Sequence, residues 1–87
     1  MEIKYHKDFL KNYKKRIAPN PSLSENFDRQ LRIFLQSPHD TILKDHKLAG
    51  RKKSLRAFSV TGDIRVVYGV ANNEIWLYDV GTHNQVY

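Results

Sequence analysis

The chain has 87 residues, no cysteine and a formal net charge of +6. The length predicts one domain over residues 1–87, and the lack of cysteine excludes disulfide bonds and thiolate metal sites. No apolar stretch reaches the roughly 20 residues of a membrane span, and no apolar secretory core follows the basic first residues, so we expect a cytoplasmic protein without a membrane partner. The charge favours an anionic partner, nucleic acid first and an acidic protein segment second, over a surface that is basic only for solubility.

A short strand and two helices are expected in the first part of the chain. Residues 1–5 alternate between apolar and charged side chains, as in a half-buried strand. Residues 6–17 and 22–37 each repeat apolar side chains at helical spacing, and Ser22 with Glu25 fits a capping box at the start of the second helix. The sequence APNP between them breaks the first helix, which predicts an antiparallel helical hairpin.

Three strands are expected in the second part of the chain. Residues 39–54 show little periodicity and predict a loop with at most one short turn. Residues 55–60, 63–70 and 74–80 are rich in strand-forming side chains, and the tight turns between them make antiparallel neighbours. The order β-α-α-β-β-β predicts an α+β fold in which the helical hairpin packs on one face of an antiparallel sheet. The other face is then at least partly open.

Arg65 is expected on that open face, in the middle of its strand. Ile64 and Val66 share the core face, so Arg65 points the other way. A guanidinium group there could clamp a phosphate, because its fork matches two phosphate oxygens and stays charged. The alternative is a surface arginine that pairs with Asp63 or Asp79.

Two histidines are candidates for proton transfer. His46 and His83 lie at the edges of the strand region, and imidazole titrates near neutral pH, so such a pair can take a proton from one oxygen and give one to another. No two histidines have the helical spacing of a zinc site, so we expect neither a metal nor a cofactor.

A basic loop and the last residue complete the candidates. Arg51, Lys52 and Lys53 form a cluster that could contact phosphates or could simply be a solvated loop. The ring of Tyr87 could stack on a nucleic-acid base or belong to a disordered end.

The stretches LKDHKLAG, LRAFSVTGDIRVVYGV and EIWLYDVGTHNQVY resemble the RelE/YafQ group of type II toxin–antitoxin toxins, in the RelE/ParE superfamily. The signatures DH-L-G, GD-R-VY and GTH occur in the family's order over residues 43–87, and the elements upstream agree. The resemblance implies a RelE-like microbial RNase fold and a ribosome-dependent endoribonuclease that cuts mRNA in the A site. The RNA's own 2′-hydroxyl would attack the adjacent phosphorus without a metal. The basic loop 51–53 looks like a surface for ribosomal RNA or the mRNA backbone.

The resemblance also implies roles for individual residues. His46 and His83 match histidines of the acid–base machinery, with the choice of acid and base left open. Asp63 matches an aspartate on the same face, and Arg65 matches an arginine at the scissile phosphate. Tyr87 matches a C-terminal aromatic residue near the mRNA base. The charge of the chain further predicts a cognate antitoxin with an acidic or amphipathic segment.

Two positions depart from the family pattern. Ser59 stands where the YafQ pattern has a further histidine, and a serine cannot replace an imidazole as a base. Asp79 stands where relatives often carry arginine; it would repel a phosphate that it faced, or it could orient His83 or Arg65. These departures leave open a non-catalytic RNA- or protein-binding relative. The other alternative is a ParE-like toxin that has the same fold and inhibits DNA gyrase, although His46 and His83 argue against it.

Overall fold

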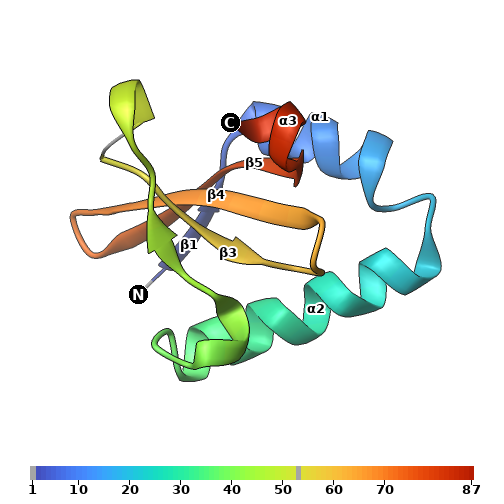
Figure 1. Cartoon of the computed structure of the whole chain (residues 1–87), viewed down its shortest axis with the longest axis horizontal. Coiled ribbons are helices and arrows are strands. Elements are labelled where there is room, and N and C mark those ends of the chain that lie inside the picture. Colours follow the sequence, from blue (N-terminus) through green and yellow to red (C-terminus); the bar gives the residue numbers. More distant parts are fainter. Residues whose placement is uncertain (1, 53) are drawn as a thin grey trace.

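The computed structural model describes residues 2–52 and 54–87, apart from the side chain of Arg51. It contains a five-stranded sheet with the strand order β1-β5-β4-β3-β2. The elements in chain order are β1 (Glu2–Tyr5), α1 (Lys7–Arg16), α2 (Pro21–Gln36), the 3₁₀ turn η1 (Thr41–Leu43), β2 (His46–Lys47), the 3₁₀ turn η2 (Gly50–Lys52), β3 (Arg56–Ser59), β4 (Ile64–Ala71), β5 (Glu74–Thr82) and α3 (His83–Val86). In Figure 1, α2 runs below the strands, and α1 and α3 lie together above them. The predicted α+β class is confirmed, and the predicted elements occur in the predicted order, with β2 and α3 in addition.

The sheet is mixed, because β1 joins it in parallel. Glu2 pairs with Glu74 and Tyr5 with Leu77, so the first strand lies beside the last one, whereas the other neighbours are antiparallel. A parallel pair needs a long crossover connection, and the whole chain between β1 and β5 supplies it. Alternation along residues 1–5 predicts a strand but contains no information about its direction.

The second helix starts earlier than its sequence signals suggested. The N-cap is Asn20, whose side chain accepts a hydrogen bond from the backbone N–H of Leu23 at 3.2 Å, and Pro21 occupies the first helical position. The capping box predicted at Ser22 and Glu25 is therefore wrong. Asparagine is a strong N-cap residue, and proline suits the first turn, where its missing N–H has no partner to lose.

The main core lies between one face of the sheet and helices α1 and α2. Phe34 of α2 stacks on Phe58 of β3 with ring centroids 4.7 Å apart, and Phe34 also meets Tyr68 of β4 edge-on at 4.8 Å. Phe9 of α1 contacts Phe27 of α2 at 5.9 Å, which joins the two helices. Such aromatic contacts add about 0.5–1.5 kcal/mol each beyond the burial of apolar area.

The opposite face of the sheet is partly covered by a smaller apolar cluster. Its buried members are Leu48, Ala57, Val67 and Val86. Val86 belongs to the short helix α3, so the end of the chain packs back onto the sheet and is anchored there. The loop predicted for residues 39–54 likewise contains ordered elements, η1, β2 and η2. No helix in residues 2–52 and 54–87 is both long and apolar enough to cross a membrane.

Candidate functional site

Both histidines among the predicted site residues lie at Tyr87, on the face of the sheet that α3 partly covers. The Tyr87 hydroxyl lies 3.3 Å from Nε2 of His46. Its ring meets the ring of His83 edge-on, with centroids 4.5 Å apart and planes at 81°. The structure therefore brings two histidines from distant parts of the sequence to the same aromatic side chain, which is 38% exposed.

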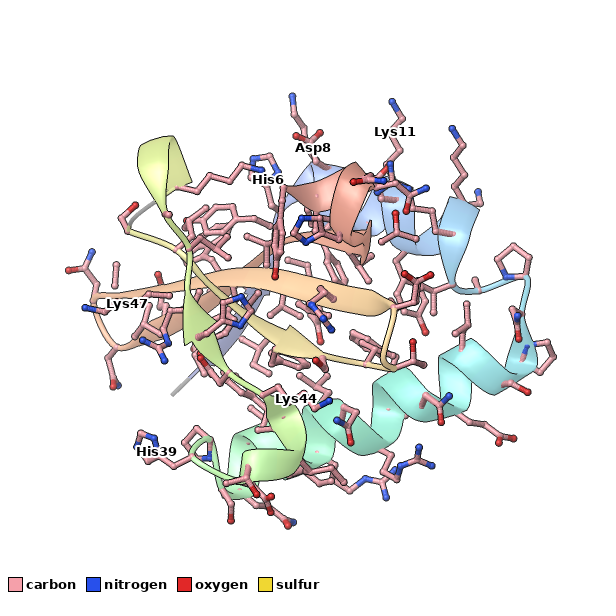
Figure 2. The ribbon with its side chains drawn as sticks, in the orientation of Figure 1. His6, Asp8, Lys11, His39, Lys44 and Lys47 are labelled. Atoms are coloured by element: carbon pink, nitrogen blue, oxygen red, sulfur yellow. The ribbon has the colours of Figure 1, made fainter. Side chains whose placement is uncertain are left out.

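His46 is positioned by the residues just before it. Lys44 adopts a left-handed backbone conformation (φ 50°, ψ 38°), which costs a non-glycine residue about 1–2 kcal/mol. The Asp45 carboxylate then accepts hydrogen bonds from Nε of Arg56 at 2.7 Å and from the Tyr68 hydroxyl. Because these contacts tie β2 to β3 and β4, His46 is presented at the sheet edge. In Figure 2, Lys44 lies on the segment that leads to this strand.

Burial of the Tyr68 hydroxyl raises its pKa, and the hydrogen bond to Asp45 adds to the rise. Tyr68 therefore stays neutral and keeps donating to the carboxylate. This contact ties the core of the fold to the segment that carries His46.

Arg65 lies opposite Ser59 across the β3–β4 hairpin. Its Nη1 donates to the Ser59 hydroxyl at 2.8 Å and lies 3.5 Å from the Thr61 carbonyl oxygen. Burial raises the pKa of Tyr87, and the nearby positive charge of Arg65 opposes that rise. The guanidinium group therefore belongs to the same cluster as Tyr87. The alternative of a surface arginine paired with Asp63 or Asp79 is not what the structure shows.

Helix α3 begins at His83, ends just before Tyr87 and is anchored at both ends. At its start, the backbone N–H of Thr82 donates to Oε1 of Gln85 at 2.8 Å. At its end, the Lys52 ammonium donates to the carbonyl oxygen of Val86. These contacts and the burial of Val86 show that residues 83–87 are packed, so the structure does not support the alternative of a disordered Tyr87.

A groove of ≈ 520 Å³ opens beside His46 and Tyr87. It is lined by His46, Lys47, Leu48, Ala49, Lys52 and Tyr87. Lys47, labelled in Figure 2, was not among the predicted site residues, although it directly follows His46. The two lysines make this groove suitable for a phosphate backbone. Lys53 and the side chain of Arg51, both predicted to bind substrate, lie outside the described residues.

The two aspartates lie apart from this cluster. Asp63 is exposed in the turn before β4, where its backbone N–H donates to Oγ1 of Thr61 at 3.2 Å. Asp79 accepts from Nδ2 of Asn12 at 2.7 Å and lies 3.5 Å from Nη1 of Arg16, both in α1. The possibility that Asp79 orients His83 or Arg65 is therefore not what the structure shows, because a helix distant in sequence provides its side-chain partners.

Some supporting residues could not be singled out from the sequence. Asp45 directly precedes His46, but only the fold shows that it binds Arg56 and Tyr68. The contact between Ser59 and Arg65 could have been found from hairpin register, because a turn at residues 61–63 places residues 59 and 65 opposite each other. Among the described residues, no group of three or more His, Asp or Glu side chains could hold a metal ion.

Comparison with known proteins identifies the family. The family model described as the bacterial toxin of type II toxin–antitoxin systems, YafQ, matches residues 1–87. The chain belongs to the YafQ toxin family. No curated protein matches the sequence.

Solved structures agree with this family assignment. YafQ from Escherichia coli BL21(DE3) is similar with a TM-score of 0.84 and 19% identity, covering 99% of this chain and 97% of that chain. The E. coli DinJ–YafQ complex gives a TM-score of 0.81 at 19% identity, with the same coverage. A copper-bound mutant toxin from Helicobacter pylori is 26% identical, with a TM-score of 0.78, covering 100% of this chain and 99% of that chain. This YafQ-family toxin therefore has the fold of its relatives over nearly its whole length.

Proposed function

We propose that this YafQ-family toxin cleaves mRNA in the ribosomal A site, by attack of the RNA's 2′-hydroxyl on the adjacent phosphorus and without a metal. Toxins of the YafQ family are endoribonucleases. The observation that carries the proposal is the meeting of His46, His83 and Arg65 around Tyr87 on an accessible face. Proton transfer and charge stabilisation are the functions that this reaction requires.

The hydrogen bonds of His46 support its role as the general base. Its Nδ1 lies 3.0 Å from the carbonyl oxygen of Lys44, so in the neutral ring Nδ1 carries the hydrogen. Nε2 then has a free lone pair, which faces the Tyr87 hydroxyl in this structure. In the proposed reaction Nε2 takes the proton of the 2′-hydroxyl as the new O–P bond forms. His83 gives a proton to the 5′-oxygen as the old P–O bond breaks, leaving a cyclic phosphate on the upstream fragment.

Arg65 would stabilise the negative charge that develops on the phosphorus oxygens. A preorganised donor of this kind is typically worth about 10²–10³ in rate. Tyr87 offers a partly exposed ring for stacking on a base, and Lys47 with Lys52 could hold the flanking backbone. We assign Asp63 a weaker part, as an exposed carboxylate two positions before Arg65 that could help to orient the substrate.

The proposed partners follow from the charge and the family. A net charge of +6 suits the ribosome, whose RNA is anionic, and translating ribosomes place the reaction in the cytoplasm. The solved E. coli relative in complex with DinJ supports a cognate antitoxin, for which we propose an acidic or amphipathic segment.

The test is to express the toxin during translation and to map mRNA 5′ ends. We expect cleavage in codon register, lowered at least about 100-fold by His83→Ala and by Arg65→Ala. His39→Ala is the matched control, because His39 lies on the exposed turn after α2, at the lower left of Figure 2 and away from α3. Growth arrest with intact mRNA and inhibited DNA supercoiling would contradict the proposal in favour of a gyrase inhibitor. Intact mRNA without growth arrest would indicate a non-catalytic relative.

A further inference from the structure

Two polar side chains are buried in the described part of the chain, and one of them donates a hydrogen bond to the backbone of the other residue. Gln30 of α2 is 4% exposed, and Ser59 at the end of β3 is 5% exposed. Burying a hydroxyl or an amide costs free energy unless each finds hydrogen-bond partners. Apolar side chains could fill both buried positions, so the reason for a polar residue at each should lie in the hydrogen bonds that it makes.

The contacts of Gln30 and Ser59 lead from the core to Arg65. Nε2 of Gln30 donates to the carbonyl oxygen of Ser59 at 2.9 Å and lies 3.4 Å from that of Ile42. The Ser59 hydroxyl then accepts the hydrogen bond from Nη1 of Arg65 at 2.8 Å. One buried amide therefore holds both the strand end that contacts Arg65 and the segment that leads to His46.

This arrangement determines which edge of the guanidinium group faces the substrate. The hydrogen bonds that Arg65 makes with the described residues all use Nη1. The edge formed by Nε and Nη2 is left for two phosphate oxygens, the geometry in which arginine binds phosphate most strongly. Without the Ser59 hydroxyl, the long Arg65 side chain would sample several rotamers, and fixing its guanidinium group at the phosphate would cost conformational entropy.

We propose that Ser59 is a positioning residue for Arg65, and that Gln30 holds Ser59 in place from the core. The effect of this positioning on catalysis rests on the proposed nuclease function, whereas the restraint that Ser59 places on the Arg65 side chain does not. The position that holds a histidine in the family pattern would thus have a different use in this chain: the hydroxyl orients the group that binds the phosphate and takes no proton itself.

The kinetic test is single-turnover cleavage of mRNA on programmed ribosomes. Ser59→Ala should lower the cleavage rate at saturating toxin about 10-fold, because small misplacements of a catalytic group are costly, and should leave the half-saturating concentration unchanged. Ser59→Thr, which keeps the hydroxyl, should restore most of the rate. Gln30→Met should lower the rate in the same way as Ser59→Ala.

A double-mutant cycle separates positioning from a general loss of stability. If Ser59 acts through Arg65, Ser59→Ala should have no further effect on the rate in the Arg65→Ala background. Ser24→Ala is the matched control, because the half-buried Ser24 hydroxyl in α2 likewise bonds one side chain, that of Tyr13 in α1 at 3.2 Å. It should leave the cleavage rate unchanged. Equal losses from Ser59→Ala in both backgrounds would overturn the proposal.

A spectroscopic test needs no cleavage at all. The ¹⁵N signals of the Arg65 guanidinium group should show slow rotation about the Nε–Cζ bond in the wild-type protein and in Ser24→Ala. Rotation should be fast in Ser59→Ala. Unchanged Arg65 signals in a folded Ser59→Ala protein would overturn the positioning role. If the wild-type toxin cleaves no mRNA while these signals respond as expected, the nuclease function fails and the positioning of Arg65 stands.

Discussion

Replacing Gly81 by alanine is expected to disturb the helix that carries His83 and Tyr87. A Cβ atom at Gly81 would lie 2.5 Å from Oε1 of Gln85 and 2.7 Å from Nη1 of Arg16, closer than a Cβ atom approaches its neighbours. Gly81 does not have a positive φ, so the requirement for glycine there is space and not backbone freedom.

The loss of stability expected for Gly81→Ala follows from the hydrogen bonds that hold the two atoms in the way of the new Cβ atom. Oε1 of Gln85 accepts from the N–H of Thr82 at 2.8 Å, and Nη1 of Arg16 donates to the carbonyl oxygen of Val80 at 2.9 Å. Moving both side chains loses two hydrogen bonds, about 1–1.5 kcal/mol each. Alanine also lowers the conformational entropy of the unfolded chain, which raises the free energy of unfolding by about 0.5–1 kcal/mol. The net loss in the free energy of unfolding is therefore about 1–2.5 kcal/mol.

Urea unfolding measures this loss directly, and Gly62→Ala is its control. Nothing lies within 4 Å of a Cβ atom at Gly62, so that variant should be as stable as the wild-type protein or slightly more stable. For a domain of this size, about 1 kcal/mol corresponds to about 4–8 °C in melting temperature. If Gly81→Ala matched Gly62→Ala in stability, the argument from close approach would be refuted. Codon-register cleavage should also fall in Gly81→Ala but not in Gly62→Ala.

Three further predictions concern the fold. Asn73→Gly should raise the free energy of unfolding by about 0.5–1 kcal/mol in urea, because φ is 62° there and glycine adopts such angles without strain; a loss of stability would contradict this. Phe58→Ala removes a fully buried ring stacked on Phe34 and should cost about 3–5 kcal/mol, so a variant with wild-type melting temperature would show that the core is misassigned. The pKa of Tyr68 is raised in the folded protein, so its phenol ionises more readily in the unfolded chain. The free energy of unfolding should therefore fall as the pH rises above about 10, and it should fall less in Tyr68→Phe. An equally steep fall in both proteins would remove Tyr68 as its cause.

The features that local sequence predicts well are those that depend on near neighbours along the chain. Helical spacing in residues 6–17 and 22–37 and the tight turns of the last strands are local properties, and the structure confirms these elements. The parallel direction of β1 is not local, because its partner β5 lies near the other end of the chain. The strand β2 has a nearby partner in β3, but its two residues are too few to show an alternating pattern. The start of α2 was mispredicted because Asn20 and Pro21 compete with Ser22 as cap signals, and only the packed helix shows which one is used.

The sequence by itself determined the α+β class and the resemblance to the family, because periodicity, turn chemistry and motif order are all present in the chain. Through that resemblance it also indicated the candidate site residues His46, Arg65, His83 and Tyr87. Only the tertiary structure decided which of the candidates meet. It brings His46, Arg65 and His83 to Tyr87, leaves Asp63 in an exposed turn and commits Asp79 to α1. The physical reason is that the partner of a side chain depends on strand register and on packing between distant elements, which residue spacing does not encode.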